Sequence, residues 1–203
     1  MGKRDETQRR IIEAAIKIIA EKGYSATKTQ EIAQIAGTSE ATVFKYFKSK
    51  KGILEVIINH AIQLLGREIA LKPIEKILED YKHAPFDEVL DLIIKDRLSM
   101  LEKQQALLTI ILKEIQYHTA IETRIMAHIY CPARQLFSDF YKHQVTIGNV
   151  RHFDSTEQLF QTLTTILIAP IARRLIVNQV LVPSELEAEL SAIKDIILRG
   201  VTC

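Results

Sequence analysis

The chain has 203 residues, which is enough for one large domain or two small ones with a sizeable core. Hydrophobic residues make up 47% and charged residues 26%, which excludes a globally disordered chain, and scarce glycine, proline and alternating patterns favour an all-α protein. Two cysteines without CxxC spacing exclude a disulfide framework and a cysteine zinc site, and the longest unbroken apolar run, Ile166 to Ala172, is too short to span a membrane.

Charge is distributed unevenly along the chain. The net charge is +2, but residues 1–52 hold 11 basic and 6 acidic residues, whereas the remainder holds 16 and 19. This division predicts a basic module on a mildly acidic body, with a polyanionic partner at the amino-terminal end. A chance excess of surface lysine is the alternative. The charged amino terminus has no apolar segment behind it, so we expect no secretory signal and a cytoplasmic protein.

The first two predicted helices are bounded by capping residues and glycines. Asp5 with Gln8 has the spacing of an N-cap pair, and isoleucines and alanines then recur at helical spacing as far as Gly23. Thr27 with Gln30 repeats the capping pattern and predicts a short helix that ends at the next glycine. The first helix has a wide apolar face, so we expect it to be packed from two sides.

The rest of the chain also predicts helices. Ser39 caps a third helix that runs to about Phe47, and Ser49 caps a fourth that reaches about residue 70. Residues 72–85 fit either a loose helix or an irregular connection. Further helices are predicted near residues 86–103, 107–115, 121–143, 154–179 and 184–200. We expect a kink at Pro132 in the third of these and a bend near Pro170 in the fourth, which begins at Asp154. The last helix is opened by Ser184 with Glu187 and closed by Gly200.

Residues 28–47 have the pattern of a helix-turn-helix motif. Ala33 is small enough for a close crossing of two helices, Gly37 suits a left-handed turn, and Val43 is a branched apolar residue that closes a small core. The predicted fold therefore has about nine helices. An amino-terminal three-helix domain with the helix-turn-helix occupies residues 1–50, and a larger helical domain occupies residues 51–203. The family resemblance given below implies that the first domain binds DNA and that the second binds an effector and dimerises.

Residues 38–52, TSEATVFKYFKSKKG, combine three aromatic residues with four lysines. On a helix, Val43, Phe44 and Phe47 fall on one side, which we expect to be buried. The other side is a short polar and basic surface that fits a DNA major groove, made of Glu40, Ala41, Thr42, Lys45 and Tyr46. Lys48, Lys50 and the start of the next helix follow where flanking phosphates would lie.

The segment GYSATKTQEIAQIAGTSEATVFKYFKSKKGIL resembles the DNA-binding domain of the TetR (tetracycline repressor-like) family of bacterial regulators. The matching features are the isoleucine-rich first helix ending in Gly-Tyr, the Ile-Ala-x-x-Ala-Gly turn, the aromatic-x-Tyr-Phe box and the Ser-Lys that follows, together covering about residues 8–60. Many relatives have tyrosine where this chain has Phe44, so a phosphate contact is lost there and Phe44 is assigned to the core.

The resemblance implies residue roles in DNA binding. Gln30, Glu40, Ala41, Thr42, Lys45 and Tyr46 would reach bases, although Glu40 fits a solvent-facing role equally well. Lys50 and the start of the second helix would bind phosphates. The expected DNA-binding residues are therefore Thr27, Lys28, Thr29, Gln30, Ser39, Glu40, Ala41, Thr42, Lys45, Tyr46, Lys48 and Lys50.

The resemblance also implies a homodimer formed by the two carboxyl-terminal helices, with ordinary core helices as the alternative. Such a dimer would bind a near-palindromic operator. The middle helices, residues 86–143, are the candidate pocket for a hydrophobic small-molecule effector. The candidate ligand residues, each of which also fits plain core packing, are Met100, Tyr117, Met126, Tyr130 and Phe137.

Glu114, His118 and Glu122 are spaced to share one helix face, which fits either a metal or acid–base site or a solvated polar face. No nucleotide or catalytic fingerprint accompanies them, so we expect no enzyme, no cofactor and no membrane partner. A ligand-responsive repressor is the preferred prediction. An effector-free architectural DNA-binding protein is the first alternative, and a helical-bundle metal enzyme is the second.

Overall fold

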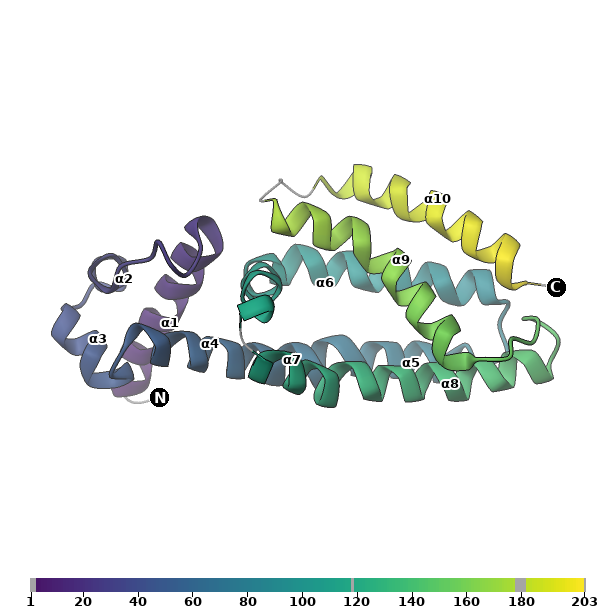
Figure 1. Ribbon diagram of the computed structural model, residues 1–203, viewed down its shortest axis with the longest axis horizontal. Coiled ribbons are helices and arrows are strands. Elements are labelled where there is room, and N and C mark those ends of the chain that lie inside the picture. The colour runs from purple at the N-terminus through teal and green to yellow at the C-terminus, as the bar shows by residue number, and fades with distance from the viewer. Residues whose placement is uncertain (1–2, 118, 178–181, 203) are drawn as a thin grey trace. The chain divides into compact units, whose positions relative to one another are not determined.

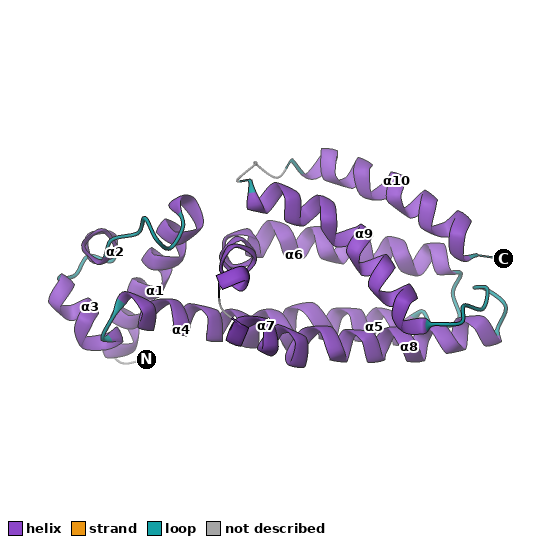
Figure 2. Cartoon of the chain, viewed as in Figure 1, coloured by secondary structure: helices purple, strands orange, loops and turns teal. Residues whose placement is uncertain are grey.

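The computed structural model describes residues 3–117, 119–177 and 182–202, and most of this length is helical (Figures 1 and 2). The predicted all-α class is confirmed. The chain divides into two compact units, which we call unit 1 (Met1–Gln63 and Ala106–Glu122) and unit 2 (Leu64–Gln105 and Thr123–Cys203). This division by contacts differs from the predicted boundary after residue 50, because the fourth helix packs with the first three.

Unit 1 begins with four helices and is completed by later segments. They are α1 (Lys3–Lys22), α2 (Thr29–Ile35), α3 (Glu40–Phe47) and α4 (Lys50–Gln63), joined by the end of α6 (Phe86–Glu114), a 3-10 turn at Ile115–Tyr117 and the start of α7 (Thr119–Ile125). Gly23 and Gly37 have φ angles of +83° and +62°, so both predicted glycine turns are confirmed. The core of this unit is made of isoleucine, alanine and leucine side chains of α1, α2 and α4.

The structure corrects two of the predicted caps in unit 1. Helix α1 already starts at Lys3, so Asp5 lies in its first turn, where a carboxylate stabilises the helix dipole. The first turn of α2 is closed by Glu31, whose Oε2 accepts from the Lys28 backbone N at 3.0 Å. Thr27 is not the cap, since its hydroxyl donates to the Gly23 carbonyl at 2.8 Å.

The caps of α3 and α4 are confirmed. The Ser39 Oγ accepts from the Thr42 backbone N at 3.2 Å, and the Ser49 Oγ accepts from the Gly52 backbone N at 3.0 Å. Both serines occupy the position where a short side-chain acceptor satisfies an otherwise unpaired helical N–H.

Helix α3 is anchored by fewer rings than predicted. Val43 and Phe47 are buried, with 1% and 6% of their surfaces exposed, but Phe44 is 43% exposed. The assignment of Phe44 to the core is therefore wrong. Val43 and Phe47 are four residues apart and nearly in line, whereas Phe44 is turned about 100° away from Val43, beyond the arc that the neighbouring helices cover.

Unit 2 contains the remaining helices and two π-helical segments. In chain order they are the π segment Leu64–Leu71, α5 (Lys72–Asp80), the first part of α6, the π segment Met126–Tyr130, α8 (Cys131–Thr146), α9 (Thr156–Ile176) and α10 (Pro183–Val201). The undecided stretch after residue 72 is mainly helical, with Pro73 in the first turn, where its missing N–H is not needed.

Interruptions in the long helices fall near the expected places. Gln104 has non-helical angles inside α6, which separates the two helices predicted there. The π segment Met126–Tyr130 directly precedes α8, which carries Pro132 at its start. Pro170 lies within α9 and is buried. The cap of α9 is Ser155, whose Oγ accepts from the Gln158 backbone N at 3.2 Å, so the prediction of Asp154 is wrong.

The last helix differs from the prediction at both ends. Val182 is the N-cap residue of α10 and makes no side-chain cap bond, so the predicted Ser184 with Glu187 pair does not open the helix. Gly200 lies inside the helix, which continues to Val201. Helices α9 and α10 contact each other. Lys194 of α10 forms an ion pair with Asp91 of α6 at 2.5 Å.

Helices α9 and α10 expose large apolar side chains. Ile168, Ile176, Val177 and Ile196 are between 53% and 67% exposed. By length and composition α9 is apolar enough to cross a membrane, a test that core helices of soluble proteins also pass, and only 33% of its apolar window is buried in this chain. This apolar surface is therefore left uncovered by the chain itself.

Candidate nucleic-acid interface

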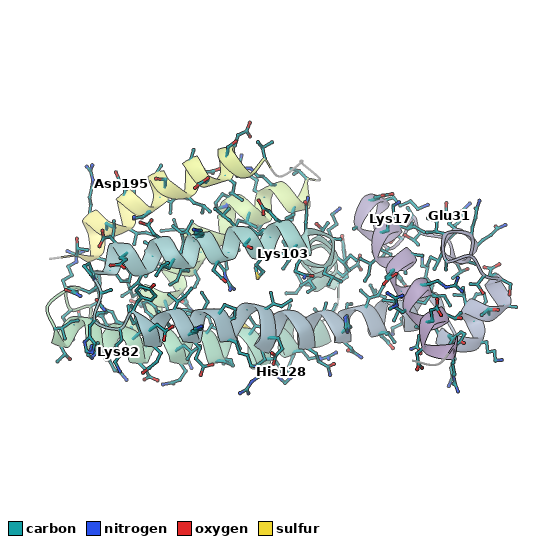
Figure 3. The ribbon with its side chains drawn as sticks, turned by 180° about the vertical axis from the view of Figure 1, so that it is seen from behind. Lys17, Glu31, Lys82, Lys103, His128 and Asp195 are labelled. Atoms are coloured by element: carbon teal, nitrogen blue, oxygen red, sulfur yellow. The ribbon has the colours of Figure 1, made fainter. Side chains whose placement is uncertain are left out.

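Helix α3 presents a polar surface on the side opposite its buried residues. Glu40, Ala41 and Lys45 are exposed, and Thr42 and Tyr46 are half-buried. Figure 3 draws the side chains around this region, with Lys17 of α1 and Glu31 of α2 labelled. The predicted separation of a buried side from a polar side is thus present, except at Phe44.

An open depression of about 550 Å³ joins α3 to α1. Thr38, Thr42, Lys45 and Tyr46 line one part of it, and Arg4, Thr7 and Arg10 of α1 line the other. The sequence interpretation did not include the three α1 residues. Positions 4, 7 and 10 lie on one face of a helix. The helix was predicted to start at Asp5, so Arg4 was left outside it and the shared face was not recognised.

Positive charge around this depression is uncompensated. Within the described residues, no ion pair is recorded for Arg4, Arg10 or Lys45. Three other cations of unit 1 are paired with carboxylates: Arg9 with Glu13 at 3.2 Å, Lys22 with Glu31 at 2.5 Å, and Lys51 with Glu55 at 3.9 Å. An anion in the depression would therefore meet three cations that no carboxylate neutralises.

Lys50 has a structural role that the sequence did not indicate. Its ammonium donates to the backbone carbonyls of Tyr24 at 2.9 Å, Thr27 at 3.0 Å and Ser25 at 3.3 Å, and lies 4.4 Å from the centre of the Tyr24 ring. These bonds use every N–H of the ammonium. In the folded chain Lys50 therefore fastens the loop between α1 and α2 to the start of α4, and its contact with a phosphate stays a prediction.

Tyr24 and Glu31 are the groups near this loop whose pKa values move. Burial raises the pKa of the Tyr24 hydroxyl, and the negative charges of Glu114 and Glu55 add to this. The pKa of the Glu31 carboxyl lies below its ordinary value of 4.5, chiefly because of the hydrogen bond from Lys22, with the Lys28 backbone N–H as the next cause.

Two threonines predicted to contact phosphates are already engaged within the protein. Thr27 is buried, with 2% of its surface exposed, and donates to the Gly23 carbonyl, and its phosphate contact stays a prediction. Thr29 donates a short hydrogen bond to the Glu40 carboxylate, which links the starts of α2 and α3. Lys28, Gln30 and Lys48 are exposed, and their roles stay predictions.

The residues predicted for an effector pocket do not all converge. Tyr117 is 73% exposed and belongs to unit 1, and Met126 is 42% exposed, so neither lines an enclosed pocket in this chain. Tyr130 and Phe137 come together, since their rings lie 5.3 and 5.4 Å from that of Phe160.

A separate open depression of about 530 Å³ lies in unit 2, between residues of α6 and α10. Its lining residues are Asp91, Ile94, Lys95, Leu98, Ser99 and Glu102 of α6 and Glu187 and Ser191 of α10.

The predicted trio of Glu114, His118 and Glu122 is only partly visible. His118 lies outside the described residues, Glu114 is buried and Glu122 is exposed. Within the described ranges, no group of at least three His, Cys, Asp or Glu side chains is placed to hold a metal ion.

Several known proteins resemble this chain in sequence. Residues 11–57 match the family model of bacterial regulatory proteins of the tetR family. The uncharacterized HTH-type transcriptional regulator YvkB of Bacillus subtilis is 47% identical over 53 residues, which are 26% of this chain and 28% of the relative. The fatty acid metabolism regulator protein of the same organism is 37% identical over 92 residues, 45% of this chain and 43% of the relative.

Solved structures resemble the chain over most of its length. The TetR family transcriptional regulator PfmR of Thermus thermophilus has a TM-score of 0.67 at 22% identity and covers 94% of this chain and 97% of its own. The transcriptional regulator FadR of Bacillus subtilis in complex with stearoyl-CoA has a TM-score of 0.63 at 23% identity and covers 94% and 95%. At these identities the likeness shows the fold.

This chain spans 28% and 43% of the length of the two curated relatives described above. The helix-turn-helix with its outward polar α3 matches the tetR family model over residues 11–57, and the fold resembles that of a solved TetR family transcriptional regulator over nearly the whole chain.

Proposed function

We propose that the protein is a cytoplasmic repressor that binds a near-palindromic operator as a homodimer and is released by a hydrophobic small molecule. The observation that carries the DNA-binding part is the polar side of α3. Thr42, Lys45 and Tyr46 face an open depression whose cations are not paired with any carboxylate of the described residues. A short helix with such a face fits a major groove, where side chains read base edges.

DNA recognition is tested by selecting a preferred duplex from a random library and measuring fluorescence anisotropy. Thr42→Ala and Lys45→Ala are expected to change the preferred sequence, with a loss of about 1–3 kcal/mol at the affected position. Lys17→Ala is the control, because Lys17 lies on α1 outside the depression. If no duplex is preferred over another, the repressor proposal is replaced by the effector-free architectural protein.

The dimer proposal rests on the uncovered apolar surface of α9 and α10. One α3 reads only a few base pairs, so a useful specificity needs two copies related by a two-fold axis. The exposed Ile168 and Ile196 would be buried against a second copy. Analytical ultracentrifugation is expected to give a dimer that Ile196→Lys dissociates. Ile147→Lys, at an exposed apolar residue after α8, is the control and should leave the dimer intact.

An apolar effector is supported by the aromatic side chains that gather in unit 2 around Phe160, namely Tyr130 and Phe137. A relative is named as a fatty acid metabolism regulator, and one solved structure of the same fold holds stearoyl-CoA. A long-chain acyl-CoA is therefore the first ligand to test.

Effector release is tested by adding stearoyl-CoA to the protein–duplex complex. We expect duplex affinity to fall by the factor that corresponds to a coupling of about 1–3 kcal/mol, and the duplex to weaken ligand binding equally. Coenzyme A without the acyl chain is the control. Phe137→Ala should reduce the response without changing duplex affinity in the absence of ligand. If neither stearoyl-CoA nor other apolar compounds change duplex affinity, this part of the proposal is wrong.

A further inference from the structure

We propose that Arg4 and Arg10 of α1 together hold a backbone phosphate of the bound duplex, beside Lys45 and the other outward residues of α3, so that the DNA-binding surface extends onto the first helix. This inference rests on the proposed DNA-binding function and adds residues that the helix-turn-helix motif does not contain. Arginine suits the task because its planar guanidinium donates parallel hydrogen bonds to phosphate oxygens.

The placement of the two arginines follows from the helical register of α1. Arg4, Thr7 and Arg10 line the same depression as Thr42, Lys45 and Tyr46. Ile11 and Ala15 of the same helix are fully buried, which fixes the direction in which α1 faces. The Arg10 Nη1 lies 3.9 Å from the position that a side-chain carbon at Gly37 would take. Arg10 therefore reaches the turn that precedes α3.

The charge around the depression has no internal neutraliser in the part of the chain that the structure describes. Arg9, next to Arg10 in the sequence, pairs with Glu13 at 3.2 Å, whereas no carboxylate partner is recorded for Arg4 or Arg10. Glu6 precedes Arg10 by four residues on the same helix face, but among the described residues no ion pair joins the two side chains. Because neither arginine is paired with a carboxylate, both guanidinium groups can donate to an anion between them.

A phosphate in this position has two possible sources, the DNA backbone or a free phosphorylated molecule. The depression is open and is shared with the outward residues of α3, so a continuous strand that places its bases against Thr42 can pass its sugar–phosphate backbone along Arg10. We therefore assign the phosphate to DNA. Such a contact fixes the position of the protein on the duplex and carries no base information.

The test compares Arg4→Ala and Arg10→Ala with Arg9→Ala in the full-length protein. Fluorescence anisotropy with a random-sequence duplex and with the selected duplex gives log Kd against log salt concentration. Each phosphate contact contributes about 0.9 to this slope. We expect the slope to fall by about 0.9 in the double variant, in which the shared phosphate is released, and by a smaller amount in each single variant, with equal factors for both duplexes. Arg9→Ala should leave the slope unchanged.

Circular dichroism and urea unfolding check that the variants are folded. Unchanged slopes in folded Arg4→Ala and Arg10→Ala would overturn the inference. If at the same time Lys45→Ala and Thr42→Ala lower duplex affinity, the proposed function stands and only the α1 contact is wrong. If none of the four variants changes duplex binding, the proposed function fails as well.

A second arm identifies the source of the phosphate. Inorganic phosphate alone is titrated by calorimetry into the wild-type protein and into Arg10→Ala. We expect no saturable binding at concentrations below about 1 mM, because a single exposed phosphate gains too little from solvated cations. Saturable binding that disappears in Arg10→Ala, with duplex affinity unchanged in that variant, would assign the depression to a free phosphorylated ligand and contradict the DNA contact.

Discussion

Replacing Lys50 with methionine tests whether this lysine stabilises the folded protein or binds DNA. The substitution keeps the length and apolar stem of the side chain and removes the ammonium, which makes three hydrogen bonds to the carbonyls of Tyr24, Ser25 and Thr27. If Lys50 bound a phosphate, the variant would lose DNA affinity through counterion release. If Lys50 fastens the loop, the variant will loosen the loop instead.

The magnitude follows from the geometry. The bonds to Tyr24 and Thr27, at 2.9 and 3.0 Å, are partly buried, and hydrogen bonds from a charged donor contribute about 1.5–3 kcal/mol when desolvated. Water partly replaces the ammonium at this half-exposed site, which reduces each contribution to about 1 kcal/mol. The bond to Ser25 at 3.3 Å is exposed and adds little, and the Tyr24 ring adds about 0.5 kcal/mol. We expect a local loss of about 2–3 kcal/mol.

Hydrogen exchange at the Thr27 amide measures this loss directly, because that amide donates to the Tyr24 carbonyl at 3.1 Å within the fastened loop. A loss of about 2–3 kcal/mol accelerates exchange by roughly 30- to 150-fold when opening is local. The slope of log Kd against log salt for duplex binding should stay unchanged. Lys48→Met is the control, since Lys48 is exposed, and it should leave Thr27 exchange as in the wild type. A fall of about 0.9 in the Lys50→Met slope, with Thr27 exchange unaltered, would refute the structural role.

Three further predictions concern helix packing, pH and assembly. Gly52→Ala should lower the urea midpoint strongly, because a side-chain carbon would lie 2.2 Å from the Phe47 carbonyl oxygen, whereas Gly200→Ala, with open space, should raise stability by about 0.5–1 kcal/mol. Equal effects would contradict this. Glu31→Gln should lower the melting temperature at pH 7, and the difference should vanish as acid protonates the wild-type carboxylate below pH 4.5, because its pKa is lowered in the folded state. A difference that persists in acid would exclude the ion pair. Ile196→Lys should weaken binding to a two-site duplex and spare a half-site duplex; equal losses on both would argue against the dimer.

The sign of the pH effect follows from linkage. The pKa of the Glu31 carboxyl is lower in the folded protein than its ordinary value of 4.5, so the ionised form favours folding. This stabilisation is fully present above that ordinary value and is lost as the pH falls through the folded value. Glutamine carries no charge at any of these pH values, and the two proteins should therefore converge in acid.

Several features of the helix-turn-helix were predictable from the sequence because they depend on neighbours along the chain. Gly37 adopts a positive φ at the turn, and Ser39 caps the helix that follows. Val43 and Phe47 lie four residues apart and are buried together. Each of these signals involves residues within one or two helical turns, where the backbone geometry is fixed by local bonding.

The sequence did not indicate the environment of residues whose neighbours lie in distant segments of the chain. Phe44 and Lys50 looked like a core ring and a phosphate ligand, yet Phe44 is exposed and Lys50 is used inside the protein, because the loop around Tyr24 returns to the start of α4. The exposure of Tyr117, a predicted effector residue, was likewise not indicated by the sequence. Composition and spacing contain no information on these distant neighbours.

The sequence by itself determined the helical class, the helix-turn-helix and the polar side of α3, because helical periodicity, caps and glycine turns are local properties of the chain. Only the tertiary structure decided that Arg4 and Arg10 of α1 share a depression with Lys45, and that Arg9, Lys22 and Lys50 are paired or bonded within the protein. The physical reason is that the environment of a charge is set by the segments that pack around it, and these are brought together by burial of apolar residues far apart in the chain.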